Sequence, residues 1–203
     1  MASYTLNAEP PVGFEKRQFN NLQLIEVLNV SIVSIAFSNN ILPKFKKLAL
    51  NKLKINIPNV GGSNFSDTKG IRLIALQQDQ IFAVYEKKSN NPINEIKSIL
   101  GDEFYYSDQS DSWSITNISG DNTINALERI CPLNLAIDSF KVNDAHRTSM
   151  EHISVIILRI NKKEFLLFES ESFVFLIALT PVSYTHLRAH ETGRNLVCRL
   201  LLE

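Results

Sequence analysis

The hydrophobic positions in the first half of the chain follow two different periods. Residues 22–37 (LQLIEVLNVSIVSIAF) are rich in β-branched side chains that partly alternate with polar ones, which predicts one long or bulged strand. In residues 40–54 the apolar side chains recur at spacings of three and four, which is typical of an amphipathic helix with Pro43 in its first turn. Further along, residues 56–70 are rich in turn formers and predict a surface loop, and residues 71–76 and 79–86 predict two strands. A helix is expected over 91–100, with Asn91 as its cap and Gly101 ending it.

The second half of the chain repeats this order. WSITNI (113–118) predicts a strand, and the residues after Gly120 predict a helix over 121–130. Because both halves read β-α-β-β-α, we expect an α+β protein of two similar lobes, each an antiparallel sheet with helices on one face. The remaining expected elements are a hairpin of 153–160 with 164–168 and a helix over 170–179. The expected domains are a flexible N-terminal arm, a first lobe and a second lobe, over residues 1–20, 21–108 and 109–180.

Composition narrows the classes of function. The 203 residues are 44% hydrophobic, and Lys+Arg balances Asp+Glu at 21 each, so no overall charge indicates a nucleic-acid partner. The apolar runs are far shorter than the roughly 20 residues that span a bilayer, and the polar N-terminus lacks the apolar core of a secretory signal. Two cysteines make neither a disulfide framework nor a zinc pattern. We therefore expect a cytoplasmic protein that contacts neither nucleic acid nor a membrane.

The last residues contain a group that resembles a metal site, since His186 and His190 are four apart and Cys198 follows. A third ligand at a recognisable zinc spacing is missing. Back-translation offers a different explanation. Residues 182–187 can be encoded by GTC TCT TAT ACA CAT CTC, the end sequence of transposase-based sequencing libraries, and residues 188–192 and 196–203 continue the adaptor in frame. We therefore expect 181–203 to be adaptor read-through, with the native C-terminus unknown beyond Thr180.

Residues Lys44 to Lys54 (KFKKLALNKLK), called the Lys-rich helix below, carry five lysines and no acid. Such a helix can dock on an acidic partner or an anionic membrane. A simpler interpretation is a surface helix whose lysines face water and whose apolar side packs on the sheet. The simpler interpretation is favoured, and docking to a partner is the better of the two functional ones.

The other polar motifs have structural explanations that are at least as good as the catalytic ones. Gly61-Gly62-Ser63-Asn64 lacks the Lys-Ser/Thr of a phosphate loop and indicates a turn. Cys131, with Arg129 nearby, is favoured as a small buried hydrophobe rather than a nucleophile. Asp108 and Asp111 are loop carboxylates that we expect to be solvated. The remaining candidates are the pairs His146-Arg147 and Glu151-His152, in which Arg147 can bind an anion or form an ion pair.

Residues 110–135 (SDSWSITNISGDNTINALERICPLNL) carry a family resemblance. The block resembles the gamma subunit of heterotetrameric sarcosine oxidase in Ser-Asp-Ser-Trp at 110–113, Ser-Gly at 119–120 and Ala-Leu-Glu-Arg-x-Cys-Pro-Leu-x-Leu at 126–135. The resemblance covers most of 71–180 and is loose over 20–70. Position 134 is Asn where the family usually has Asp, which weakens any role for that acid.

The resemblance implies a folate-binding aminomethyltransferase-type domain of ferredoxin-like lobes. It also implies a complex that oxidises sarcosine to glycine, with hydrogen peroxide and, from tetrahydrofolate, methylene-tetrahydrofolate as products. FAD, FMN and NAD are expected on the alpha and beta subunits and zinc on the delta subunit. The gamma chain is expected to supply assembly contacts and no catalytic, cofactor-binding or metal-binding residues.

A free-standing folate-binding or aminomethyltransferase-like protein is the alternative. It would require a carboxylate for the pterin and a cation for the glutamate tail of folate, and Arg147 is the candidate for the cation. For the subunit hypothesis, the Lys-rich helix and the N-terminal arm are the candidate surfaces for the partner subunits. The substrate among N-methyl amines is left open.

Overall fold

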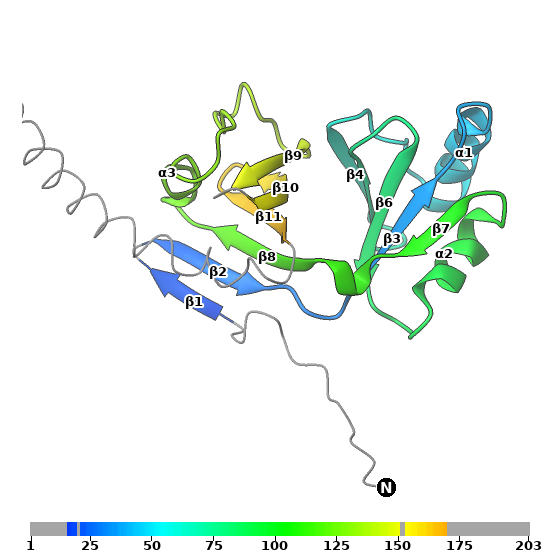
Figure 1. The fold of residues 1–203 in the computed structure, drawn as a ribbon, viewed down its shortest axis with the longest axis horizontal. Coiled ribbons are helices and arrows are strands. Elements are labelled where there is room, and N and C mark those ends of the chain that lie inside the picture. The colour runs from blue at the N-terminus through cyan, green and yellow to red at the C-terminus, as the bar shows by residue number, and fades with distance from the viewer. Residues whose placement is uncertain (1–15, 20, 151–152, 170–203) are drawn as a thin grey trace, which may run out of the picture.

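The computed structural model describes residues 16–19, 21–150 and 153–169, whose strands form two fully antiparallel sheets (Figure 1). The six-stranded sheet has the order β1-β2-β8-β11-β10-β9, and the five-stranded sheet has the order β4-β5-β6-β3-β7. The six-stranded sheet contains β1 (Lys16–Phe19), β2 (Leu22–Glu26), β8 (Ser114–Ser119), β9 (Ala145–Met150), β10 (Ile153–Asn161) and β11 (Glu164–Glu169). The five-stranded sheet contains β3 (Val30–Ala36), β4 (Gly62–Ser66), β5 (Ile71–Ala75), β6 (Gln80–Glu86) and β7 (Tyr105–Asp108).

The helical elements pack on the outer faces of the sheets. Two helices and a π-helical turn cover the five-stranded sheet, and a short helix lies over the six-stranded one (Figure 1). These elements are α1 (Leu42–Leu48), η1 (Ala49–Leu53), α2 (Pro92–Leu100) and α3 (Thr123–Leu127), with a 3₁₀ turn η2 (Ser110–Ser112) between the sheets in sequence. The described residues include no helix long and apolar enough to cross a membrane.

Each sheet is buried on both faces. Successive side chains of a strand point to opposite faces, so Val33 and Ile35 of β3 pack under the helices while Ile32 faces the other sheet. An apolar core between the two sheets takes Phe82 from β6 and Ile156 from β10. This double burial explains why these strands are almost continuously apolar. The expected helix-covered face is confirmed, and the contact between the sheets is an addition to the expectation.

The order of the five-stranded sheet confirms a ferredoxin-like lobe. β3, β5, β6 and β7 alternate with the helices in the expected way, β3 lies between β6 and β7, and β4 adds an edge strand. In the six-stranded sheet, β8, β10 and β11 take the places of β3, β5 and β6, but the place that corresponds to β7 is filled by β2. The chain before residue 27 therefore joins the strands of the second half.

The prediction of a single long strand over 22–37 is consequently wrong. β2 and β3 lie in different sheets, and Asn29 in the connection between them has a left-handed backbone with φ +57°. The apolar pattern continues through the break because both strands have buried faces. Spacing of apolar residues reports burial and does not report which sheet a strand enters.

Several other expectations can be compared with the fold. The helix over 91–100 is confirmed, with the Asn91 side chain accepting from the Asn94 N–H at 3.1 Å and Gly101 following the last residue. The hairpin of β10 and β11 is also confirmed. The helix expected over 121–130 is shorter, at Thr123–Leu127, and four strands were not predicted: β1, β4, β7 and β9. β1 pairs with β2, so residues 16–19 of the expected flexible arm form a strand. The N-terminal arm before Lys16, the expected helix over 170–179 and the tail lie outside the described residues.

Candidate functional site

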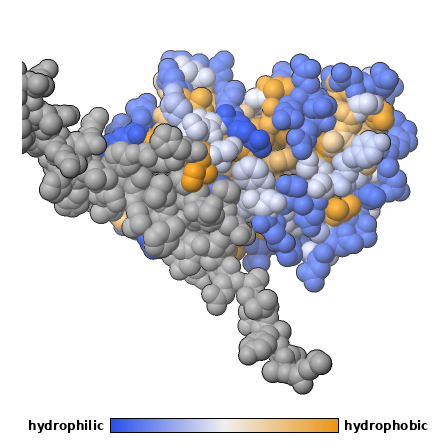
Figure 2. Space-filling model, viewed as in Figure 1, coloured by the Kyte–Doolittle hydropathy of each residue, from blue (hydrophilic) through white to orange (hydrophobic). Residues whose placement is uncertain are grey.

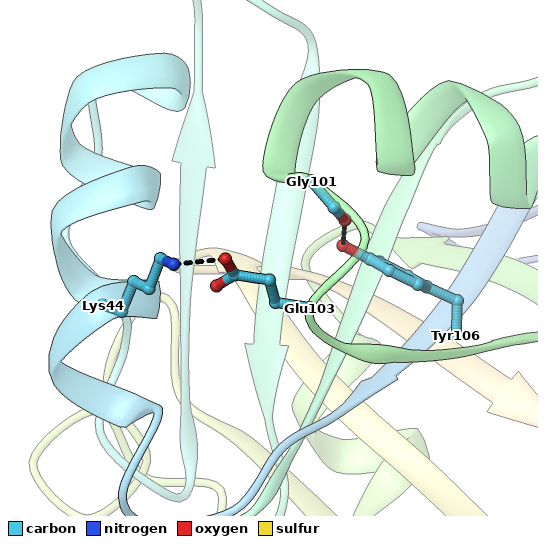
Figure 3. Close-up of polar contacts among 4 residues, drawn as sticks. All are labelled: Lys44, Gly101, Glu103 and Tyr106. Carbon is cyan, nitrogen blue, oxygen red and sulfur yellow. Dashed lines mark hydrogen bonds and ion pairs between the residues drawn. The ribbon is translucent and has the colours of Figure 1, made fainter.

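The Lys-rich helix forms as α1 followed by η1, and its lysines are all exposed. Phe45, Ala49 and Leu53 on its other side are buried in the core above the five-stranded sheet. Lys44 forms an ion pair with Glu103, near the point where the Tyr106 hydroxyl donates to the Gly101 carbonyl at 2.6 Å (Figure 3). The prediction of an amphipathic surface helix is confirmed, and docking to a partner stays a prediction.

Gly61 and Gly62 make the turn into β4 and do not form a phosphate cradle. The N–H groups of Gly61, Gly62 and Ser63 already donate to the carbonyls of Ala75, Asn59 and Asn143, at 2.8, 3.0 and 2.7 Å. Gly61 has φ +85°, and a Cβ there would lie 2.9 Å from Cε1 of His146. The glycine is thus required by backbone geometry and by the neighbouring ring. Ser63 and Asn64 belong to the strand rather than to the expected turn.

Cys131 is buried, at 5% exposed, in the core between the six-stranded sheet and α3. Burial raises the pKa of its thiol, against smaller opposing effects of hydrogen bonds from Leu133 and Thr148. A thiol with a raised pKa is a poor nucleophile at neutral pH, because little thiolate is present. The prediction of a small buried hydrophobe is confirmed.

Asp108 and Asp111 are exposed near the 3₁₀ turn η2. Asp108 Oδ1 accepts from the backbone N–H of Ser110 at 3.0 Å and from its hydroxyl at 2.6 Å. The Ser110 hydroxyl in turn accepts from the backbone N–H of Ile32 at 3.1 Å. The first serine of the Ser-Asp-Ser-Trp motif therefore ties the segment between β7 and β8 to β3, which is a structural role.

His146 and Arg147 on β9 are both exposed. The Arg147 guanidinium carbon lies 5.8 Å from the centre of the Trp113 ring, and the Trp113 ring contacts Phe82. Arg147 forms no ion pair with a described residue, so the anion site and the ion pair expected for it both stay predictions. His146 lies beside Phe140, with ring centres 5.4 Å apart. Glu151 and His152 lie outside the described residues.

Arg159 was not singled out from the sequence, although a charge inside an apolar run is a signal of special packing. It is fully buried, and its guanidinium donates to the carbonyls of Phe140 and Leu135 at 2.6 and 2.7 Å. The Phe165 ring lies 4.7 Å from its guanidinium carbon. Arg159 thus holds the loop after the Cys-Pro-Leu-Asn-Leu block against β10. Asn134 Oδ1 accepts from the Ala136 N–H at 3.0 Å, so Asn134 organises a turn.

Glu169 at the end of β11 is the most perturbed carboxyl that the structure describes. It is fully buried, and neither carboxyl oxygen has a hydrogen-bond partner among the described residues. Burial raises its pKa to about 8, so the group is mainly neutral at pH 7. A perturbed buried acid is a candidate functional group in an enzyme. No described nucleophile or cation contacts it here.

A metal centre is not formed by the part of the chain that the structure describes, because no three His, Cys, Asp or Glu side chains come together there. The tail residues His186, His190 and Cys198 lie outside it. On the face of the described residues that is visible in Figure 2, hydrophilic residues predominate and apolar residues lie between them.

Comparisons with known proteins give the fold. No protein-family model and no curated protein matches the sequence significantly. Among solved structures, a chain of the heterotetrameric sarcosine oxidase from Corynebacterium sp. U-96 in complex with pyrrole 2-carboxylate superimposes with a TM-score of 0.70 and 19% identity. The match covers 86% of this chain and 95% of that one.

The glycine cleavage system aminomethyltransferase T from Bartonella henselae is a second match. It has a TM-score of 0.58 and 11% identity, covering 79% of this chain and 45% of that chain. This chain therefore has the α+β fold that an aminomethyltransferase and a chain of sarcosine oxidase share. In the oxidase the fold makes up nearly a whole chain, and in the aminomethyltransferase it makes up less than half of one.

Proposed function

We propose that this chain is the non-catalytic gamma subunit of a heterotetrameric sarcosine oxidase, which oxidatively demethylates sarcosine to glycine. The observation that carries the proposal is the 95% coverage of one chain of such a complex at a TM-score of 0.70. The resemblance of residues 110–135, which rests on sequence motifs, is what favours the gamma subunit among the chains of such a complex. The structural match thus supports the complex, and the sequence motifs support the subunit.

The roles of the described side chains are consistent with an assembly subunit. The family block is used for structural contacts: Ser110 and Asp108 at the crossing between sheets, Asn134 in a turn, and Cys131 in the core. FAD, FMN, NAD, zinc and tetrahydrofolate would belong to the alpha, beta and delta subunits. The described residues offer no fit for the zinc ion, since no group of possible ligands converges.

The alternative of a free-standing aminomethyltransferase-like enzyme is less favoured. The chain spans only 45% of aminomethyltransferase T, so the rest of that enzyme has no counterpart in the match. The expected cation Arg147 stacks on Trp113, and the buried Glu169 lies at the end of β11. No contact links these two groups into a folate site.

Co-expression with the alpha, beta and delta subunits tests the assignment. We expect the chain to co-purify with them in one complex whose production of hydrogen peroxide depends on sarcosine. The same complex lacking this chain should be less stable or fail to assemble. A chain that stays apart when all the other subunits are present would contradict the proposal.

A further inference from the structure

The edges of the two sheets meet at a seam, where the chain next to β9 pairs with β4. Gly62 and Asp144 form an antiparallel bridge, the Ser63 N–H donates to the Asn143 carbonyl at 2.7 Å, and the Ala145 N–H donates to the Gly61 carbonyl at 3.0 Å. The seam therefore joins residues that are about 80 positions apart in sequence. Surface groups on either side of it come from different lobes.

Exposed apolar side chains lie at one end of this seam. Phe65 is 44% exposed and follows Ser63 by two residues, and Val142 is 41% exposed and precedes Asn143. Asn143 has a left-handed backbone with φ +71° and lies in a turn closed by the bond from the Asp144 N–H to the Lys141 carbonyl at 3.0 Å. An exposed aromatic and an exposed valine, contributed by the two lobes, are thus close neighbours in sequence of the residues Ser63 and Asn143 that pair across the seam.

A cation completes this group. The Arg72 guanidinium carbon lies 5.1 Å from the centre of the Phe65 ring, and Nη1 donates to Ser63 Oγ at 3.1 Å and to Asn143 Oδ1 at 3.0 Å. Both acceptors are neutral, and Arg72 forms no ion pair with any described residue. Partial burial lowers the pKa of Arg72, which reflects the loss of water around its charge.

The arrangement has the composition of an energetically important protein–protein contact. Arginine and aromatic residues are enriched at such positions, and an arginine fork recognises a carboxylate through two parallel hydrogen bonds. Two bonds use Nη1, so the rest of the guanidinium is available to an outside acceptor. The charged neighbours in sequence are Lys69, Lys141, Asp67 and Asp144, and Asp144 already accepts from the Lys141 N–H at 2.6 Å.

We propose that the seam surface, defined as Phe65, Arg72, Val142 and Asn143, binds an acidic segment of a partner subunit. A carboxylate of that segment bonds to Arg72, and an apolar side chain next to it covers Phe65 and Val142. The inference rests on the proposed function, since it identifies where the other subunits of the oxidase contact this chain. It assigns the contact to the seam rather than to the Lys-rich helix.

Substitutions at the seam test this inference in the full complex. Phe65→Ala and Val142→Asp should each weaken the apparent affinity for the alpha, beta and delta subunits by about tenfold or more. Val142→Lys should weaken it less than Val142→Asp, because lysine does not repel an acidic segment. Tyr105→Ala is the matched aromatic control. Tyr105 is 80% exposed on β7, at the edge of the five-stranded sheet opposite β4, and should bind like the wild type.

The affinities are measured by biolayer interferometry, and a thermal unfolding scan of each free variant verifies that it is folded. Wild-type affinity in a folded Phe65→Ala variant overturns the inference while leaving the proposed function intact, provided that the wild-type chain assembles. An equal loss of affinity in Tyr105→Ala also overturns it. If the wild-type chain fails to assemble, the proposed function falls, and the inference falls with it.

Discussion

Arg159 and Glu169 are buried ionisable residues of the same hairpin, and they differ in the partners that surround their side chains. Two carbonyls and two aromatic rings hold the Arg159 guanidinium and offset part of the cost of burying its charge. Its Nε has no hydrogen-bond partner among the described residues, and burial lowers its pKa. Glu169 has no such partners among the described residues, and burial alone determines its ionisation. Among the described residues, the backbone supplies acceptors for Arg159 near one end of the hairpin and no hydrogen-bond donor for the Glu169 carboxyl group at the other.

The raised pKa of Glu169 predicts a pH dependence of stability. Between its ordinary value of 4.5 and about 8, the folded state holds a proton that the unfolded state has released. The stability therefore falls as the pH rises through this window. Glu169→Gln removes the ionisation and should make the protein more stable than the wild type at pH 8.5, by roughly 2–4 kcal/mol.

Urea unfolding of both proteins at pH 5 and pH 8.5 measures this difference. The Gln variant should differ little from the wild type at pH 5, where the wild-type carboxyl is protonated in the folded state. A wild type and a variant with the same pH profile would show that Glu169 ionises normally.

At the level of elements, β2 can join the six-stranded sheet only because the backbone before β2 lies very close to the backbone after β8. Gly120, after β8, has φ +127°, and a Cβ there would overlap the carbonyl oxygen of Asn21. The same carbonyl accepts from the Asn122 N–H, so the chain before β2 is held against the start of α3. Only glycine allows this approach.

Two glycine substitutions separate the effect of the close approach from that of backbone conformation. Gly120→Ala should lower the free energy of unfolding by about 2 kcal/mol or more, because strain and overlap add. Gly70→Ala should cost about 1 kcal/mol, since Gly70 also has a positive φ but a Cβ there meets nothing within 4 Å. Guanidinium unfolding gives both values, and equal losses would mean that the β2 contact is unimportant.

For the whole molecule, the two sheets form one folding unit. The core between them takes apolar side chains from both, and β2 completes the sheet that the second half of the chain begins. The expected division at residue 108 would leave β2 in a fragment that contains none of its partners from the second half. β2, which the expected first lobe includes, thus pairs with β8 of the expected second lobe.

This topology predicts that fragments 21–108 and 109–180 do not fold separately. Each would expose its side of the inter-sheet core, and β8 would lose its β2 neighbour. Near-UV circular dichroism should show little fixed aromatic packing in either fragment, and mixing the two should restore it. A cooperative unfolding transition in one isolated fragment would contradict the prediction.

The sequence by itself determined the elements with strong local signals. The Lys-rich helix, the Asn91-capped helix and the β10–β11 hairpin follow from spacing, capping and turn residues within a few positions of each other. The structural role of Cys131 was also predicted from the sequence, because no clear basic activator lies near it along the chain.

The tertiary structure decided what distant residues do to one another. β4 and the residues before β9 are polar and read as loop, yet they pair because Ser63 and Asn143 meet across the seam. The contacts of Arg72 with Phe65 and Asn143 form only when the pairing of β5 with β4 brings these residues together. The break between β2 and β3 was hidden because two strands buried in different sheets have the same apolar pattern. Local sequence encodes which residues are buried, and only the folded chain determines what buries them.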